Sequence, residues 1–108
     1  MFYQKHLQQF HRVSAVFAVS DYYAIELMHF LTEQGFYVPG DISIAGFDDT
    51  PMCEMVHPTL TTVRQDGALR AKTAIEKLRE LRENILDGTE IRLPVFLVVR
   101  NSTDKRTK

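Results

Sequence analysis

Polar side chains stand directly after three short apolar runs of the sequence. Ser20 and Asp21 follow the first run, Asp48 and Asp49 follow the second, and Gln65 follows the third. In α/β proteins, ligands bind beyond the carboxyl ends of parallel strands. If the apolar runs are such strands, we expect these side chains at a common edge of the sheet.

The adjacent carboxylates of Asp48 and Asp49 are the most chemically specific feature. A carboxylate at a strand end can accept hydrogen bonds from a sugar hydroxyl or a base amine, or hold a divalent metal. The same pair also suits a turn in which one Asp caps the next segment. Ser20 or Asp21 can likewise cap a helix, and Gln65 can be a solvated linker. The residue types alone leave both kinds of role open.

The apolar pattern predicts alternating strands and helices that would position these side chains. Expected strands lie at residues 13–19, 42–47, 60–64 and 91–99, because their apolar runs have strand length. Apolar residues at helical spacing predict helices at 3–12 and 22–34 and a long helix capped by Asp66 and ended by Asp87 and Gly88. A single helical turn is expected within residues 50–57. This order predicts an α/β fold, a three-layer αβα arrangement with a mostly parallel sheet.

Composition sets aside several classes of function. The chain has 108 residues, and its 13 basic against 14 acidic side chains give a net charge of −1, which is a poor basis for binding DNA phosphates. The one cysteine, Cys53, cannot form an internal disulfide, which favours the cytoplasm. No apolar run approaches the roughly 18–20 residues of a membrane span, so we expect no membrane partner.

Catalytic and metal-binding signatures are not found in the sequence. It has no nucleophile elbow, phosphate loop or glycine fingerprint, so we expect no enzymatic activity and no cofactor. His6 and His11 are five positions apart and do not share a helical face. We therefore expect no metal at these histidines.

The helix expected at 22–34 has a predicted core stripe of Ala24, Leu27, Met28 and Leu31 and carries further apolar surface beside it. The excess fits either a wide buried face or contact with a second subunit. For the second case, the predicted subunit interface combines this helix with the following turn and comprises Tyr22, Ile25, His29, Met52, Met55 and Val56.

Three segments and the last strand together resemble a known family. Residues 15–21 (AVFAVSD), 38–49 (VPGDISIAGFDD) and 58–65 (PTLTTVRQ) are similar in order and spacing to the effector-binding domain of LacI/GalR-type bacterial transcription regulators. Residues 93–103 are similar to that family's closing strand. The resemblance covers about residues 13–103.

The resemblance implies the type I periplasmic-binding-protein fold, in which two α/β lobes close on a small ligand. Residues 1–108 would then be part of an effector-binding domain, with 13–65 in the second lobe, 66–99 in the first lobe and 100–108 as a tail. A separate N-terminal helix-turn-helix headpiece reads operator DNA in this family, and we expect it to be absent from this chain.

The resemblance also implies ligand contacts. They fall at Ser20, where the family usually has Asn, and at Asp21, Asp48 and Gln65, with Asp48 foremost and Asp49 more structural. The implied effector is a small sugar or a nucleobase.

The predicted function is therefore ligand sensing within a LacI/GalR-type transcription regulator. One alternative is part of a periplasmic sugar-binding protein of a transporter, which shares the fold. A less favoured alternative is a phosphotransfer or receiver-type domain in which Asp21, Asp48 and Asp49 hold magnesium.

An apolar strand such as residues 95–99 leaves unpaired edges when its usual neighbours lie outside the chain. We therefore predict that the chain self-associates as a homodimer or as a domain-swapped oligomer that exchanges residues 66–99. Analytical ultracentrifugation at micromolar concentration is expected to show a dimer or larger species. A compact monomer would contradict the prediction.

Overall fold

The computed structural model describes residues 2–83 and 90–106 of the chain. These fall into two compact units, Met1–Arg64 with Leu97–Lys108, and Gln65–Phe96. The division lies next to the boundary at residue 65 that the resemblance implies between lobes. The assignment of each segment to a lobe stays a prediction.

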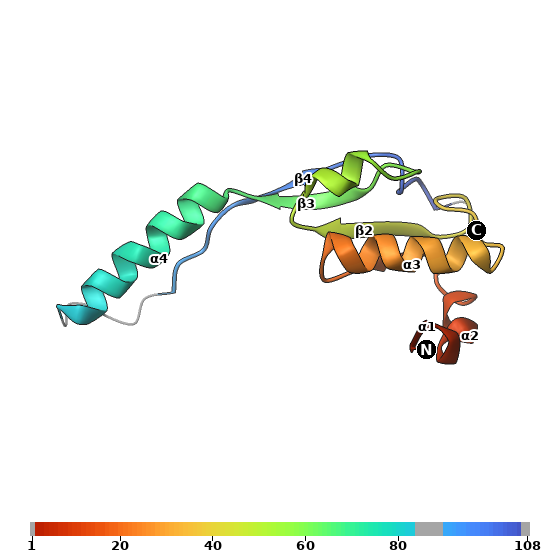
Figure 1. The fold of residues 1–108 in the computed structure, drawn as a ribbon, viewed down its shortest axis with the longest axis horizontal. Helices are drawn as coiled ribbons and strands as arrows, with labels where there is room; N and C mark the ends of the chain where they lie inside the picture. The colour runs from red at the N-terminus through yellow and green to blue at the C-terminus, as the bar shows by residue number, and fades with distance from the viewer. Residues whose placement is uncertain (1, 84–89, 107–108) are drawn as a thin grey trace. The chain divides into compact units, whose positions relative to one another are not determined.

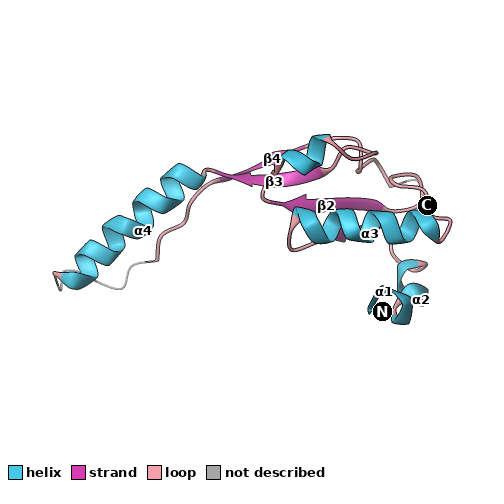
Figure 2. Cartoon of the chain, viewed as in Figure 1, coloured by secondary structure: helices cyan, strands magenta, loops and turns pink. Residues whose placement is uncertain are grey.

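A four-stranded sheet in the order β1-β2-β3-β4 forms the framework (Figure 2). Its strands are β1 (Ala15–Phe17), β2 (Ser43–Phe47), β3 (Thr61–Gln65) and β4 (Val95–Val98). β1 pairs with β2, and β2 with β3, in parallel. The α/β class with its mostly parallel sheet is thereby confirmed, and each strand lies within or next to its predicted range.

Helix α3 (Asp21–Glu33) lies along β2 and supplies half of the core (Figure 1). Its predicted core stripe is buried: Ala24, Leu27, Met28 and Leu31 are at most 4% exposed. Ile44 of β2 and Leu60 before β3 are fully buried against it. The additional apolar residues of this helix are partly buried and partly exposed: Phe30 is buried, whereas Tyr22 is 61% exposed.

The helix expected at 3–12 is interrupted. It consists of two single turns, α1 (Phe2–Lys5) and α2 (Leu7–Phe10), because the His6 backbone leaves helical geometry at ψ 13°. Tyr3 packs its ring on Phe30, with 5.5 Å between ring centroids. Burial is the main cause that raises the pKa of Tyr3 to about 12, and a hydrogen bond with Glu26 adds to it.

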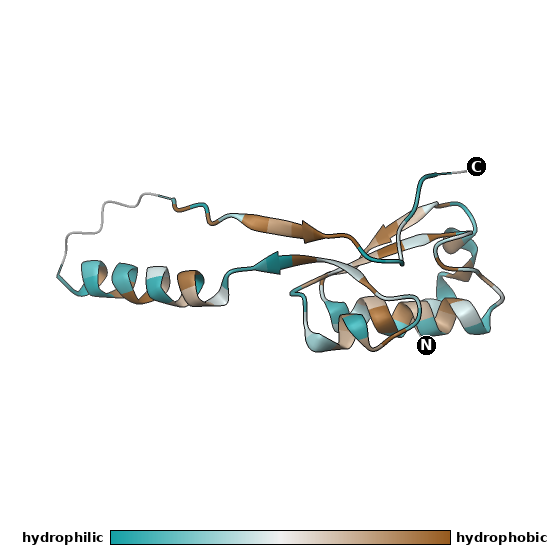
Figure 3. Cartoon of the chain, turned by 90° about the horizontal axis from the view of Figure 1, so that it is seen from above, coloured by the Kyte–Doolittle hydropathy of each residue, from teal (hydrophilic) through white to brown (hydrophobic). Residues whose placement is uncertain are grey.

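The second unit contains α4 (Gly67–Arg82). The Asp66 carboxylate accepts a hydrogen bond from the Leu69 N–H at 3.0 Å, which confirms the predicted N-cap. The predicted helix end at Asp87 and Gly88 lies outside the described residues. The helix is amphipathic (Figure 3), and the apolar residues Ile75, Leu78 and Leu81 are each more than half exposed. No helix within residues 2–83 or 90–106 is both long and apolar enough to cross a membrane.

Residues 100–104 are built into the first unit, although residues 100–108 are predicted to form a tail. The Ser102 hydroxyl is buried, accepts from the Thr61 N–H at 2.8 Å and donates to the Ile44 carbonyl at 2.5 Å. The Thr103 and Thr61 hydroxyls are 2.7 Å apart. The polar side chains here satisfy backbone groups of neighbouring strands, which composition alone cannot distinguish from solvation.

Gly46 lets the start of α3 approach β2 closely. A Cβ atom added at this position would lie 2.6 Å from Asp21 Oδ1 and 3.1 Å from a methyl group of Leu60. Both neighbours are fixed by burial, so neither can move aside cheaply.

Gly46→Ala is expected to lower the free energy of unfolding by about 1–3 kcal/mol, because the added methyl overpacks the site beside Asp21. Urea denaturation followed by circular dichroism measures the loss. The matched control is Gly67→Ala, since an added Cβ at Gly67 meets nothing within 4 Å. Equal losses in the two variants would contradict this account.

Candidate functional site

Ser20 caps helix α3 at the carboxyl end of β1. Its backbone is extended, and its Oγ accepts a hydrogen bond from the Tyr23 N–H at 3.3 Å. The capping role considered for this position is confirmed. The side chain is half-buried, so a ligand could still reach it. Its ligand role remains a prediction.

Asp21 is buried, with 1% of its surface exposed. Its Oδ2 accepts from the Thr50 N–H at 2.7 Å, and its Oδ1 accepts from the Thr62 hydroxyl at 2.5 Å. Both carboxylate oxygens are thus used inside the protein. The side chain joins the start of α3 to the segment after β2 and to β3, and it is closed to an effector in this structure.

The electrostatics of Asp21 follow from these bonds. Burial by itself would raise its pKa, but hydrogen bonds from the Thr50 N–H, the Thr62 hydroxyl and the Cys53 thiol outweigh burial and lower the pKa. Burial and the neighbouring Asp21 raise the pKa of Cys53 to about 11. Cys53 therefore remains a buried, protonated thiol at neutral pH and donates to the carboxylate.

Asp48 and Asp49 form a turn at the carboxyl end of β2 and have opposite surroundings. The backbone has a positive φ at both residues, 119° at Asp48 and 57° at Asp49. Asp48 is exposed, and its N–H donates to the Val63 carbonyl of β3 at 2.8 Å. Asp49 Oδ1 accepts from Arg100 Nη2 at 2.7 Å, in agreement with the structural role predicted for Asp49.

Arg100 is the residue of this site that the sequence analysis missed. Its guanidinium donates to Asp49 and, through Nη1, to the Leu60 carbonyl at 2.9 Å. Its Nη2 lies 3.5 Å from Glu54 Oε1. Burial by itself would lower the pKa of Arg100, but the hydrogen bond to Asp49 and the Asp49 charge outweigh burial and raise the pKa. The only signal in the sequence is an arginine directly after an apolar strand.

Gln65 ends β3 and belongs to the second unit. Its side chain is half-buried, and its Oε1 accepts from Arg70 Nη1 at 3.2 Å. The bond is exposed, so the amide is not sealed away from solvent. The ligand role of Gln65 remains a prediction.

The magnesium alternative finds no support. Within residues 2–83 and 90–106, no group of three or more His, Cys, Asp or Glu side chains is arranged to hold a metal. The physical reason is that Asp21 is committed to Thr50 and Thr62, and Asp49 to Arg100.

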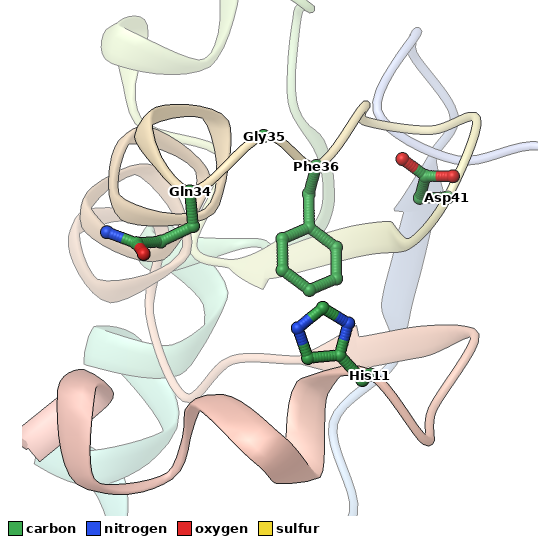
Figure 4. A pocket seen from close by; sticks show the side chains of 5 residues that line it. All are labelled: His11, Gln34, Gly35, Phe36 and Asp41. Carbon is green, nitrogen blue, oxygen red and sulfur yellow. The ribbon is translucent and has the colours of Figure 1, made fainter.

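A polar recess of about 190 Å³ lies away from these residues, where α3 leads into β2 (Figure 4). The rings of His11 and Phe36 are adjacent and tilted by 37°, with centroids 4.7 Å apart. The Asp41 carboxylate accepts from the Tyr37 N–H at 2.8 Å. Asp41 precedes β2 and Asp48 follows it, so the recess and the turn lie at opposite ends of this strand.

A groove of about 240 Å³ separates α3 from the segment after η1 (Pro51–Glu54). Three predicted interface residues, Ile25, His29 and Val56, line it. The other three, Tyr22, Met52 and Met55, are 61%, 39% and 76% exposed. The structure therefore leaves the predicted interface open to solvent.

Comparison with known proteins gives consistent matches. Residues 2–103 match the family described as periplasmic binding protein-like domain. The chain is 36% identical over 91 residues to the lactose operon repressor of Escherichia coli strain K12, covering 83% of this chain and 25% of that protein. The chain thus spans about a quarter of this relative's length.

Solved structures agree with the sequence relatives. A lac repressor dimer bound to operator and the anti-inducer ONPF has a TM-score of 0.74 at 31% identity, covering 94% of this chain and 38% of that one. A complex of the transcriptional regulator CelR with cellobiose has a TM-score of 0.71 at 30% identity, covering 83% and 28%.

Asp21→Asn is expected to destabilise the protein by about 1–3 kcal/mol at pH 7, because an amide NH2 would face one of the two donors that the carboxylate now accepts from. The folded-state pKa of Asp21 is lowered, so the contribution of the carboxylate is present above about pH 4 and is lost as pH falls through that lowered pKa.

The measurement is urea denaturation of the wild type and Asp21→Asn at pH values from 7 to 3. The difference in unfolding free energy is expected to shrink below about pH 4. Glu76→Gln on the exposed face of α4 is the control, with no difference expected at pH 7. A difference for Asp21→Asn that stays constant down to pH 3 would rule out the charged carboxylate as its source.

Proposed function

Because the chain belongs to the periplasmic binding protein-like family, we propose that it forms the C-terminal part of the effector-binding domain of a LacI/GalR-type transcription regulator. The effector is a small sugar or a nucleobase. The relatives are repressors and regulators, so the transporter alternative is not favoured.

The exposed position of Asp48 is the observation that carries the proposal. It stands at the carboxyl end of a parallel strand, where ligands of such sheets bind. A carboxylate there can accept two hydrogen bonds, which suits adjacent sugar hydroxyls or a base amine and ring N–H. Ser20 would add a neutral polar contact, and the contact of Gln65 stays a prediction.

The division of work among the carboxylates supports this role. Asp21 and Asp49 are bound by Thr62 and Arg100 respectively, so they fix the backbone around Asp48. We assign Asp21 a positioning role in place of the predicted ligand contact. A rigid surround lowers the entropy that is lost when a ligand binds.

The proposed mechanism is a population shift between open and closed lobes. An effector that contacts both lobes stabilises the closed state, and the changed geometry alters how a dimer places its DNA-binding headpieces. This chain supplies contacts from only part of such a site, so its own affinity for effector is weak. DNA binding is assigned to the headpiece, in keeping with the net charge of −1 of this chain.

The role is one of binding, with no catalytic step and no cofactor, and the proposed location is the cytoplasm. The buried free thiol of Cys53 suits a reducing compartment.

The proposed homodimer surface is the predicted interface on α3 and the segment after β2. It combines exposed apolar side chains, such as Met55 at 76%, with the groove beside Ile25 and Val56. Met55→Glu would place a charge on this apolar surface and is expected to lower the sedimentation coefficient to the monomer value. A dimer that swaps residues 66–99 would tolerate this change.

The effector site is tested by titrating the ¹⁵N-labelled chain with lactose, cellobiose, D-ribose and hypoxanthine. At least one probe is expected to shift the Asp48 and Asp49 amide signals, with a dissociation constant on the order of millimolar. Asp48→Asn is expected to weaken that binding about tenfold or more, since the amide offers one acceptor in place of a charged pair.

Glu76→Gln serves as the control and is expected to leave the affinity unchanged. Shifts confined to the recess of His11 and Asp41, or full affinity in Asp48→Asn, would contradict the proposed site.

A further inference from the structure

The turn at Asp48 and Asp49 adopts an uncommon backbone. Positive φ values of 119° and 57° occur at two adjacent residues, neither of which is glycine. Asp tolerates the left-handed region near φ 57° better than most residues, but φ 119° is strained for any side chain. Such a conformation persists only where the surrounding structure holds it.

Two backbone donors attach this turn to β3. The Asp48 N–H donates to the Val63 carbonyl at 2.8 Å, and the Asp49 N–H donates to the Thr62 hydroxyl at 3.3 Å. These bonds hold the backbone near the strand. They do not account for the direction of the Asp49 carboxylate, which is only 13% exposed while Asp48 is exposed.

Arg100 supplies that remaining constraint. Its Nη2 lies 2.7 Å from Asp49 Oδ1, and its Nη1 donates to the Leu60 carbonyl at 2.9 Å. Its backbone N–H donates to the Thr61 hydroxyl at 2.9 Å. The arginine is therefore anchored at both ends to residues 60 and 61, and it presents a fixed cation to the carboxylate.

A second cation, Arg64, lies farther from Asp49 than Arg100 does and is more exposed. Arg64 Nη1 lies 3.8 Å from Oδ2, but its side chain is 59% exposed, against 14% for Arg100. Solvent screens the Arg64 pair more strongly. Without Arg100, a largely buried carboxylate would be left with only this weak partner, which favours a turn that brings Asp49 to solvent.

We propose that Arg100 is a positioning residue for effector binding. It holds the Asp49 carboxylate inward, and this keeps the backbone of Asp48 and Asp49 at positive φ and Asp48 exposed. The proposal rests on the proposed function, in which Asp48 contacts the effector.

The test is an NMR measurement on the 108-residue chain without ligand. The φ-sensitive HN–Hα couplings and ¹³C shifts of Asp48 and Asp49 report the turn directly. Arg100→Met is expected to change both residues while the signals of α3 stay in place. Arg100→Lys keeps the charge but loses the forked geometry, and it is expected to retain part of the wild-type couplings.

The double variant Arg100→Met with Asp49→Gly separates positioning from general stability. Glycine adopts positive φ without steric cost and removes the buried carboxylate. The couplings of Asp48 are therefore expected to return to the wild-type values, including in the case where Arg100→Met alone does not fold. Unchanged couplings in Arg100→Met, or no recovery in a folded double variant, would overturn the proposal.

A sugar titration distinguishes this proposal from the one it rests on. For a probe from the panel that shifts wild-type Asp48, Arg100→Met is expected to weaken binding about tenfold, and the double variant to recover most of it. If no probe shifts wild-type Asp48, the proposed function fails. The ligand-free couplings still decide whether Arg100 holds the turn.

Discussion

The buried carboxylate of Asp21 is the interaction on which the first unit depends. It accepts hydrogen bonds from the Thr50 N–H and the Thr62 hydroxyl, and it lies against Gly46. One side chain thus joins the start of α3 to the segment after β2 and to Thr62 near the beginning of β3. A buried charge is tolerated only where several donors compensate its desolvation, so the positions of these loops are coupled to one another.

A second compensated carboxylate, Asp49, lies nearer the surface than Asp21. Arg100 neutralises Asp49 as Thr62 and Thr50 satisfy Asp21, and the exposed carboxylate of Asp48 remains at the surface of this framework. In the proposed site, the two internal carboxylates position the turn that presents Asp48. In the proposed effector site, specificity would come from geometry as well as from charge, since Asp48 could not follow a poorly matched ligand without disturbing its anchored neighbours.

The likeness to lac repressor and CelR structures supports a role for this geometry in effector binding. Effector contacts in a two-lobed domain come from both lobes, and this chain spans about a quarter of the lactose operon repressor that it matches. The exposed apolar residues of α4 and β4, such as Leu78 and Phe96, fit a chain that normally packs against further structure.

The sequence by itself determined the element order, the parallel sheet, the core stripe of α3, the Asp66 cap and the family. These depend on local patterns of period and capping, which adjacent residues encode. Only the tertiary structure decided that Asp21 is an internal anchor, that Ser102 is buried and that Arg100 reaches Asp49. The partners of these side chains are about 30 to 60 positions away in the chain. Whether a polar residue faces solvent or satisfies a distant buried group depends on contacts that no local pattern records.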